Sequence, residues 1–473
     1  MAQPRTVSAA APRVQVIAPA SLGATALAAL RARGIDARAA PAPASATDAG
    51  DDVLAWALDA TPGAAAAAEL AAACAHAAAA GRPVCLLAPP PRGTGRAAIE
   101  RAAALAYLRA HGAALFHDVD AWLEAAVLLV RFGLPAGPRA AIIAPPGSWL
   151  EAQAAAVAAE AELAGARSPL ASLDDPADPT DAVLFDPALG APPRQLPGLH
   201  VPVAARAELA GDSLALYGAR AALGAVAILG RAAERTAVGI GPAPRAASAE
   251  LEIDADRLRR QLDKLGSEPR LGDHETKVLL SAYGVPITRQ AVAMTPSAAV
   301  KLARRAGYPV ELKPWGHDLP TEPAGCPVER GISSDALVRK AFATVLAAAG
   351  RPAEGSAVIV RETPPAGRDL AVSLRRLPAL GWTVLLDAPG GAPLAAAPAP
   401  LRLTDAQALA AQVVASRAGE PEPDRSGLAN LLRRASHLVV DLDARLAAIE
   451  LTRVVVGGRG ARTLVVDAYA ELA

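Results

Sequence analysis

The chain has 473 residues, more than one hydrophobic core normally serves, so we expect several domains. Lys+Arg and Asp+Glu each number 47, and this balance argues against a nucleic-acid-binding protein or a polybasic membrane-surface protein. No long uncharged apolar stretch predicts a membrane span, and the first residues lack the pattern of a signal peptide. Three widely separated cysteines fit reduced thiols, so we expect a cytoplasmic protein.

The first half of the chain alternates short apolar segments with alanine-rich segments of helical length. Strands are predicted at 13–19, 82–90, 139–147, 181–187 and 199–203. Helices are predicted between them, among others at 24–34, 97–112 and 149–165. This alternation is typical of parallel βαβ sheets with helices on both faces. Because the pattern restarts near 139, we predict two flavodoxin-like α/β units, at 10–137 and 138–240.

The second half differs in character. Residues 241–254 are rich in Gly, Pro, Ala and Ser at their start and are predicted to be a linker. Residues 255–473 combine amphipathic helices with longer strands of antiparallel type, which predicts an α+β domain. Its clearest helix is predicted at 272–286, with Asp273 or a neighbour as the cap and Gly284 and Pro286 at the end. Later strands are predicted at 356–362, 369–377, 382–388, 447–456 and 462–470.

Lysine is rare in this chain, and its placement is informative. The chain contains five lysines, and all of them fall between residues 264 and 340. Lys313 ends an apolar strand and precedes a Pro-Trp-Gly turn. An ammonium group at the end of a strand can reach the phosphates of a nucleotide bound against the sheet.

Residues 271–316 resemble the opening of the ATP-grasp domain in NDP-forming (ADP-forming) acyl-CoA synthetases. That family has the pattern E-x-x-K-x-L-L-x-x-Y-G-I-P, and Lys277 with the following Leu-Leu and Tyr-Gly fits it. The family continues with A-x-x-x-G-y-P-V-v-l-K, whose lysine contacts ATP, and Lys313 occupies that position. The resemblance implies that Lys277 and Lys313 bind ATP.

Further positions of the same family can be matched in order. Arg361 and Glu362 fall on the strand that faces the adenine in the family. Gly390 and Gly391 match a Gly-Gly turn whose backbone approaches the phosphates. Glu450 matches an acid that faces the metal ions. The resemblance therefore implies ATP and Mg²⁺ as cofactors, with CoA as a substrate.

Four departures from the family bear on activity. The chain starts at a succinyl-CoA-ligase-like flavodoxin unit, without the Rossmann-type CoA-binding domain. The phosphohistidine loop of the family has no counterpart, since no histidine follows the strand at 82–90 before His111. The His-Lys pair of the ATP-grasp loop is missing from 315–328, where His317 is the candidate substitute. Thr452 replaces a metal-binding asparagine, which weakens the case for two metal ions.

The resemblance leaves three interpretations open. The first is an ADP-forming ligase of acyl-CoA synthetase type, which joins a small carboxylic acid to CoA and takes its CoA-binding domain from a partner subunit. The second is a catalytically degenerate, nucleotide-binding regulatory or scaffold subunit. The third is an ATP-grasp ligase that passes an acyl phosphate directly to an amine or thiol. The missing histidines favour the last two, whereas Lys313 and Glu450 favour nucleotide binding in all three.

Overall fold

The computed structural model describes most of the chain in two compact units. The described residues are 13–40, 52–153, 156, 180–187, 198–205, 215–263, 269–322, 325–387, 393–414, 422–458 and 460–473. The first unit comprises Met1–Arg92 with Glu100–Gly241, and the second comprises Gly93–Ile99 with Pro242–Ala473.

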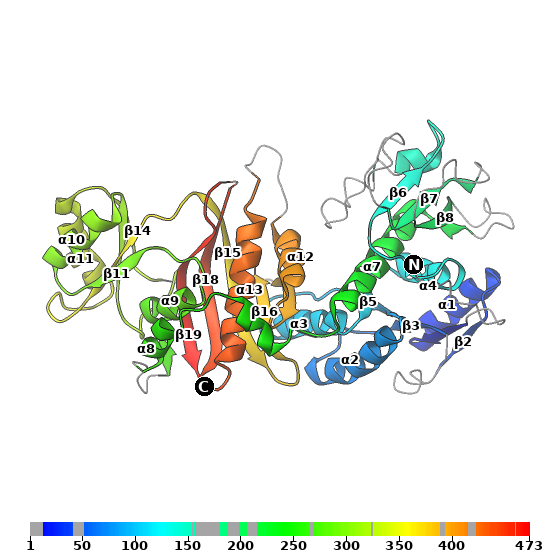
Figure 1. The fold of residues 1–473 in the computed structure, drawn as a ribbon, viewed down its shortest axis with the longest axis horizontal. Helices are drawn as coiled ribbons and strands as arrows, with labels where there is room; N and C mark the ends of the chain where they lie inside the picture. The colour runs from blue at the N-terminus through cyan, green and yellow to red at the C-terminus, as the bar shows by residue number, and fades with distance from the viewer. Residues whose placement is uncertain are drawn as a thin grey trace. The chain divides into compact units, whose positions relative to one another are not determined.

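The first unit contains a five-stranded parallel sheet with the strand order β2-β1-β3-β4-β5 (Figure 1). Its strands are β1 (Val14–Ile17), β2 (Ala37–Ala39), β3 (Val53–Ala57), β4 (Val84–Leu87) and β5 (Ala113–Phe116). Its helices are α1 (Ala20–Ala32), α2 (Ala64–Ala79), α4 (Val119–Arg131) and most of α3 (Arg96–Ala110). The order 2-1-3-4-5 is that of flavodoxin-like sheets. The central strand β3 is absent from the sequence-based prediction, because five buried residues give neither alternation nor a helical period.

A second parallel sheet follows in the same unit, with the order β6-β7-β8-β9. Its strands are β6 (Ala140–Ile143), β7 (Ala182–Phe185), β8 (Leu199–Ala204) and β9 (Leu216–Tyr217), and helix α7 (Ala219–Val238) follows them. Most of the helix predicted at 149–165 lies outside the described residues. The parallel-sheet architecture of the first half is confirmed, and the exact boundary near 137 stays a prediction.

The second unit contains two antiparallel sheets. The six-stranded sheet has the order β10-β19-β18-β15-β16-β17, and the four-stranded sheet has the order β11-β14-β12-β13. The first is built from β10 (Arg270–Leu271), β15 (Gly367–Leu377), β16 (Gly381–Asp387), β17 (Pro393–Pro398), β18 (Leu446–Gly457) and β19 (Leu464–Leu472). The second is built from β11 (Gln290–Ala293), β12 (Val310–Pro314), β13 (Glu329–Ile332) and β14 (Val358–Glu362). The antiparallel α+β class predicted for this half is therefore confirmed.

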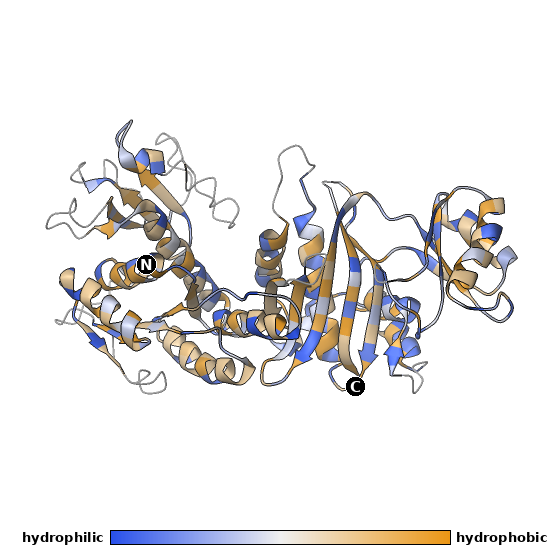
Figure 2. Ribbon diagram, turned by 180° about the vertical axis from the view of Figure 1, so that it is seen from behind, coloured by the Kyte–Doolittle hydropathy of each residue, from blue (hydrophilic) through white to orange (hydrophobic). Residues whose placement is uncertain are grey.

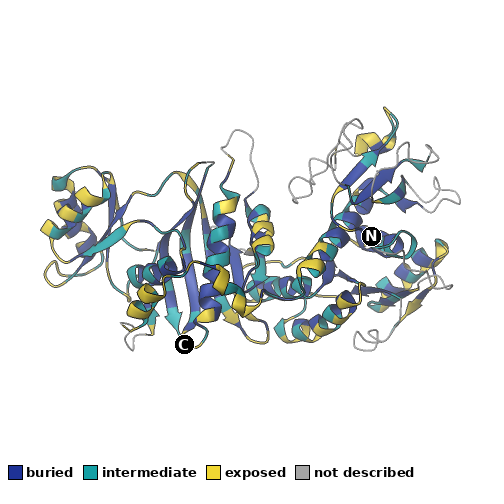
Figure 3. Ribbon diagram, viewed as in Figure 1, coloured by how far each residue is buried: buried dark blue, intermediate teal, exposed yellow. Residues whose placement is uncertain are grey.

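Helices cover one face of each sheet in the second unit. Helices α12 (Leu403–Val413) and α13 (Arg425–Asp441) pack on the six-stranded sheet, and α10 (Pro296–Ala306) and α11 (Asp335–Ala348) pack on the four-stranded sheet (Figure 1). Apolar and polar residues alternate along the long strands in Figure 2, and Figure 3 shows the same strands as mostly buried. Alternation places apolar side chains on the helix-covered face and polar side chains on the other.

Helix α9 (Asp273–Ala282) lies next to β19 and begins one residue later than predicted. Its N-cap is Gly272, and Asp273 is the first helical residue. The helix ends at Tyr283 and Gly284, and Gly284 has a φ of 71°, a conformation that glycine adopts without strain. Helix α8 (Ala255–Leu262) precedes it, and the predicted linker contains a short 3₁₀ helix, η3 (Arg245–Glu250). None of the described helices is long and apolar enough to cross a membrane.

Candidate functional site

Lys313 lies at the end of β12, where the two antiparallel sheets of the second unit approach each other. Its side chain is buried, and its ammonium group forms an ion pair with Asp467 on β19. A second carboxylate, that of Asp273 at the start of α9, lies 3.6 Å from the same nitrogen. Burial alone would lower the pKa of Lys313, but the carboxylates of Asp273 and Asp467 outweigh burial and raise it.

Lys277 lies one helical turn after Asp273 and is fully buried. Its Nζ lies 3.1 Å from Asp273 Oδ1 and donates to Thr288 Oγ1 at 3.0 Å and to Gln290 Oε1 at 2.8 Å. It also donates to the carbonyl oxygen of Val466. Burial lowers the pKa of Lys277 to about 8, against the opposing effect of Asp273. This ammonium group therefore loses its proton far more readily than an exposed lysine does.

Arg361 on β14 is the third buried cation at this place. Its guanidinium group donates to Glu311 Oε2 on β12 at 2.9 and 2.6 Å and lies 2.6 Å from Glu322 Oε1. It also donates to the Val466 carbonyl at 3.0 Å, so this backbone oxygen accepts from both Arg361 and Lys277.

These groups form one buried charge network that joins both sheets, helix α9 and the loop after β12. Its members are Asp273, Lys277, Glu311, Lys313, Glu322, Arg361 and Asp467, none of them more than 7% exposed. Buried charges are stable only when they are paired, and here four carboxylates surround three cations. Asp273, Glu311, Glu322 and Asp467 are not among the residues that the sequence predicted as site residues.

The cavity beside Lys313 is small. It is lined by Lys313, Asp273, His317 and Tyr469 among others, and its volume is about 10 Å³. That is room for about one water molecule. Glu322 helps to close the site, because its backbone N–H donates to Asp467 Oδ2 at 2.5 Å while its side chain reaches Arg361.

Four predicted residues lie around this network or outside the described part. His317 is exposed in the loop after β12 and lines the small cavity. Glu362 points to Arg289 instead, whose Nε donates to Glu362 Oε2 at 2.7 Å. Gly390 and Gly391 lie outside the described residues.

Glu450 lies on β18 with partners of its own. It accepts a hydrogen bond from the Ser373 hydroxyl, and its Oε1 lies 2.5 Å from Nε of Arg375. Burial raises the pKa of Glu450, against the opposing effects of Ser373 and Arg375. Tyr469 is the register partner of Glu450 and also lines the cavity of Lys313, so the two predicted residues share this neighbour.

The donor set for a metal ion is limited. No group of three or more His, Cys, Asp or Glu side chains suited to a metal ion occurs among the described residues. Asp467 and Glu450 still offer carboxylate oxygens, and Thr452 donates from its hydroxyl to Asp467 Oδ2 at 3.3 Å. Mg²⁺ is commonly held by one or two carboxylates together with the phosphates of a substrate. The described residues do not form a complete protein cage, so a metal ion here would depend on phosphate oxygens, and Glu450 as its ligand stays a prediction.

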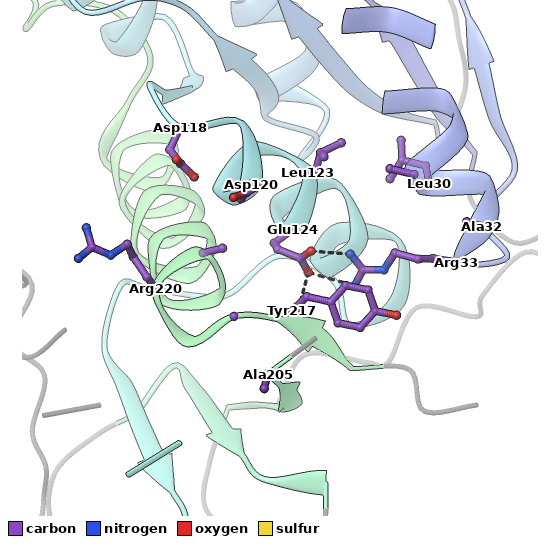
Figure 4. Close-up of a pocket in the computed structure, with 13 residues that line it drawn as sticks. Leu30, Ala32, Arg33, Asp118, Asp120, Leu123, Glu124, Ala205, Tyr217 and Arg220 are labelled. Carbon is purple, nitrogen blue, oxygen red and sulfur yellow. Dashed lines mark hydrogen bonds and ion pairs between the residues drawn. The ribbon is translucent and has the colours of Figure 1, made fainter. Parts of the chain in front are cut away.

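The first unit has a separate cavity of about 610 Å³, shown in Figure 4. Arg33 Nη2 donates to Glu124 Oε2 on α4 at 3.0 Å and to the carbonyl of Ala215 at 2.8 Å, and its guanidinium lies 3.9 Å from the ring centroid of Tyr217. The backbone N–H of Tyr217 donates to the same carboxylate at 3.0 Å. These contacts hold the short strand β9 against α1 and α4.

The second unit matches a known family. Residues 266–472 match the family described as ATP-grasp domain. This part of the chain is an ATP-grasp domain. The buried charge network lies within the ATP-grasp domain, at the approach of its two sheets.

The chain is homologous to ADP-forming carboxylate–CoA ligases. It is 30% identical over 133 residues to the acetate–CoA ligase (ADP-forming) I subunit beta of Pyrococcus furiosus, covering 27% of this chain and 57% of the relative. It is 26% identical over 212 residues to the corresponding II subunit beta, covering 41% and 89%. A 4-hydroxybutyrate–CoA ligase (ADP-forming) of Nitrosopumilus maritimus is 26% identical over 142 residues, covering 29% of this chain and 20% of that relative.

A solved structure is also similar over part of the chain. It is the dinucleotide-forming acetyl-coenzyme A synthetase 1 of Ca. Korarchaeum cryptofilum, in complex with coenzyme A, Ca-AMPCP and HgCl+. The sequence identity is 25%, the TM-score is 0.40, and the match covers 46% of this chain and 99% of the other.

Replacing Arg361 with methionine is expected to destabilise the ATP-grasp domain by about 3–5 kcal/mol, because Glu311 and Glu322 would stay buried without their main cation. The measurement is calorimetric unfolding of the full chain. The matched control is Arg289→Met, which removes an arginine that is 69% exposed and pairs with Glu362; its effect should be below about 1 kcal/mol. Equal small effects of both variants would contradict a structural role for the network.

Proposed function

We propose that the chain is an ADP-forming ligase of the acyl-CoA synthetase type, which binds ATP with Mg²⁺ in its ATP-grasp domain. The observation that carries the proposal is the convergence of Lys277, Lys313 and Arg361 between the two sheets of that domain. The phosphates of a nucleoside triphosphate carry several negative charges, which cations must balance. A cluster of cations in a site with little water binds phosphates strongly. The similarity to ADP-forming CoA ligases supports this reaction class.

When the nucleotide binds, the buried cations exchange their carboxylate partners for phosphates. The phosphates take the place of carboxylates beside Lys277, Lys313 and Arg361, so that these cations keep a negative partner throughout. Asp467 and Glu450 would hold Mg²⁺, and the bound ion would neutralise phosphate charge. Glu311 and Glu322 also lie 3.8 and 2.7 Å from Arg330, so these two displaced carboxylates keep a cation after the exchange.

The reaction that we propose consumes a small carboxylic acid, CoA and ATP and yields an acyl-CoA thioester, ADP and phosphate. The bond between the γ-phosphorus and the oxygen bridging to ADP breaks, and a bond from that phosphorus to a carboxylate oxygen of the acid forms, which gives ADP and an acyl phosphate. The CoA thiol then loses its proton, its sulfur bonds to the acyl carbon, and the bond from that carbon to the phosphate oxygen breaks, which releases inorganic phosphate. A CoA-binding partner subunit and a cytoplasmic location belong to the same proposal, with His317 as the candidate carrier of a phosphoryl group.

The small cavity beside Lys313 favours a second candidate function, that of a nucleotide-binding regulatory or scaffold subunit. All three cations of the charge network are already paired with carboxylates. The cavity beside Lys313 has a volume of about 10 Å³, far below the 300–1,000 Å³ of ordinary ligand pockets. A nucleotide can enter only when Glu322 and the segment 315–322 move away from Arg361 and Lys313.

Lys313→Gln is expected to weaken the binding of Mg–ATP at least tenfold, or about 1.4 kcal/mol, because an ammonium contact to phosphate is lost. Calorimetric titration of the full chain measures this, with Lys301→Gln, an exposed lysine on α10, as the matched control. Unchanged affinity in a folded Lys313→Gln variant would contradict the assigned role.

Turnover separates the two candidate functions and uses the same protein. The full chain is incubated with γ-labelled ATP and short-chain carboxylic acids, with and without CoA. ADP release that requires both the acid and CoA supports the ligase, and acid-labile phosphoprotein supports a histidine carrier. ATP binding without turnover supports the regulatory subunit, and ADP release that requires an amine or another thiol in place of CoA supports direct transfer from an acyl phosphate.

Removing the charge of Glu322 is expected to strengthen ATP binding. Glu322 competes with the phosphates for Arg361, so Glu322→Gln should lower the Kd for Mg–ATP by about threefold or more. Glu329→Gln on β13 is the control, since it removes an exposed carboxylate from the same sheet. Weaker binding of ATP to the Glu322 variant would argue against competition.

The pKa of Lys277 gives a pH dependence to binding. A lysine with a pKa of about 8 is increasingly neutral above pH 8, whereas bound phosphates favour its protonated form. Mg–ATP affinity should therefore fall as pH rises above about 8, by up to tenfold per pH unit, with uptake of up to one proton. Calorimetry in buffers of different ionisation enthalpy measures the uptake. Proton uptake that persists unchanged in Lys277→Met would assign the effect to another group.

A further inference from the structure

The second unit contains another cationic cavity, which lies along the edge strand β11. Neither Lys313 nor Arg361 lines it. Its volume is about 620 Å³, and it is lined from α8, from the segment 287–291 and from the last turn of α10. Figure 1 locates these elements. A volume of this size is within the range of small-molecule binding pockets, in contrast to the cavity beside Lys313.

The charged side chains that line this cavity are all arginines. They are Arg257 on α8, Arg289 before β11 and Arg305 on α10. Arg289 pairs with Glu362, whereas Arg257 and Arg305 form no ion pair with a carboxylate of the described residues. No aspartate or glutamate is among the described residues that line the cavity. Positive charge is therefore concentrated in a concave place, which attracts anions.

Gln290 supplies a donor in the same cavity. Its Oε1 accepts from the ammonium group of Lys277 at 2.8 Å, so the amide nitrogen must be on the other side of the side chain. That nitrogen, Nε2, is buried and has no hydrogen-bond partner among the described residues. An unpartnered buried donor costs free energy, and a ligand acceptor would recover it only after a movement of the side chain exposes the nitrogen.

The remaining wall of the cavity is mostly apolar, with Ser281 and Thr288 as its polar residues. Ile287 and Leu302 line it together with smaller side chains and Val360. Guanidinium groups bind phosphate through paired, planar hydrogen bonds, and an apolar wall accepts a ring or a hydrocarbon chain. The combination selects a small molecule that carries both a phosphate and an apolar part.

We propose that this cavity, here called the arginine pocket, binds a small phosphate-bearing molecule at a place separate from the nucleotide of the charge network. Arg257 and Arg305 contact the phosphate oxygens, and the Gln290 amide donates to the same ligand after its side chain moves. Since Gln290 also contacts Lys277, a ligand in the arginine pocket lies two hydrogen bonds away from the charge network.

The test uses the full chain in magnesium-free buffer of low ionic strength. Calorimetric titrations with inorganic phosphate, pyrophosphate and AMP compare the unchanged protein with Arg257→Gln/Arg305→Gln. Binding of pyrophosphate or AMP should weaken at least tenfold in this variant, as expected for the loss of two guanidinium contacts. Binding should also weaken as salt is added.

A matched control removes the same charge from the same two helices. Arg260→Gln/Arg304→Gln changes exposed arginines of α8 and α10 that do not line the pocket, and it should bind the probes as the unchanged protein does. Equal weakening in both double variants would assign binding to general charge attraction and overturn the proposal.

Lys313→Gln separates the arginine pocket from the nucleotide site. Probe binding that survives Lys313→Gln and is lost in Arg257→Gln/Arg305→Gln supports a separate pocket. Probe binding that is lost only in Lys313→Gln, or an absence of binding by all three probes at millimolar concentration, overturns it. Because the arginines of α8 and α10 are exposed, the single variant Arg305→Gln serves if the double variant does not fold.

Discussion

The ion pair between Lys313 and Asp467 is the interaction on which the organisation of the ATP-grasp domain depends. It joins a strand of the four-stranded sheet to a strand of the six-stranded sheet in the domain interior. Isolated charges are not stable in such a place, so each buried cation of the network requires a carboxylate and each carboxylate a cation. A substitution at one of these positions therefore changes which residue types are tolerated at the others. A ligand that displaces a carboxylate must itself carry negative charge to pair with the cation.

The alternation of side chains along β14 divides the four-stranded sheet into two different faces. Arg361 points to the charge network, whereas Val358 and Val360 belong to the apolar core under α10 and α11. The same alternation on β11 gives Gln290 to the network side as the register partner of Arg361. A strand of ordinary composition can thus serve a polar site and an apolar core at once, because successive residues face opposite directions.

The sequence predicted the fold class and the cationic half of the site better than the acidic half. Lys313 stands out because a lone lysine ends an apolar strand, and Lys277 because its helix carries a recognisable pattern. Asp467 lies almost 200 positions after Asp273, and only the fold brings the two carboxylates to one ammonium group. A signal for Asp467 does exist, since a single acid interrupts the apolar run Leu464–Val466 and Ala468. Glu322 lies in a loop without periodicity, so its burial depends on tertiary contacts alone.

The carbonyl oxygen of Val466 accepts hydrogen bonds from Lys277 and Arg361. This acceptor belongs to the main chain, so every amino acid at position 466 would present it equally well. Its contribution leaves no trace in the identity of residue 466, and scanning that position with other side chains would report only on packing. An ester in place of the amide between residues 466 and 467 would weaken this acceptor while keeping all side chains. Part of the electrostatics of the domain thus depends on the backbone path of strand β19 and not on the identity of its side chains.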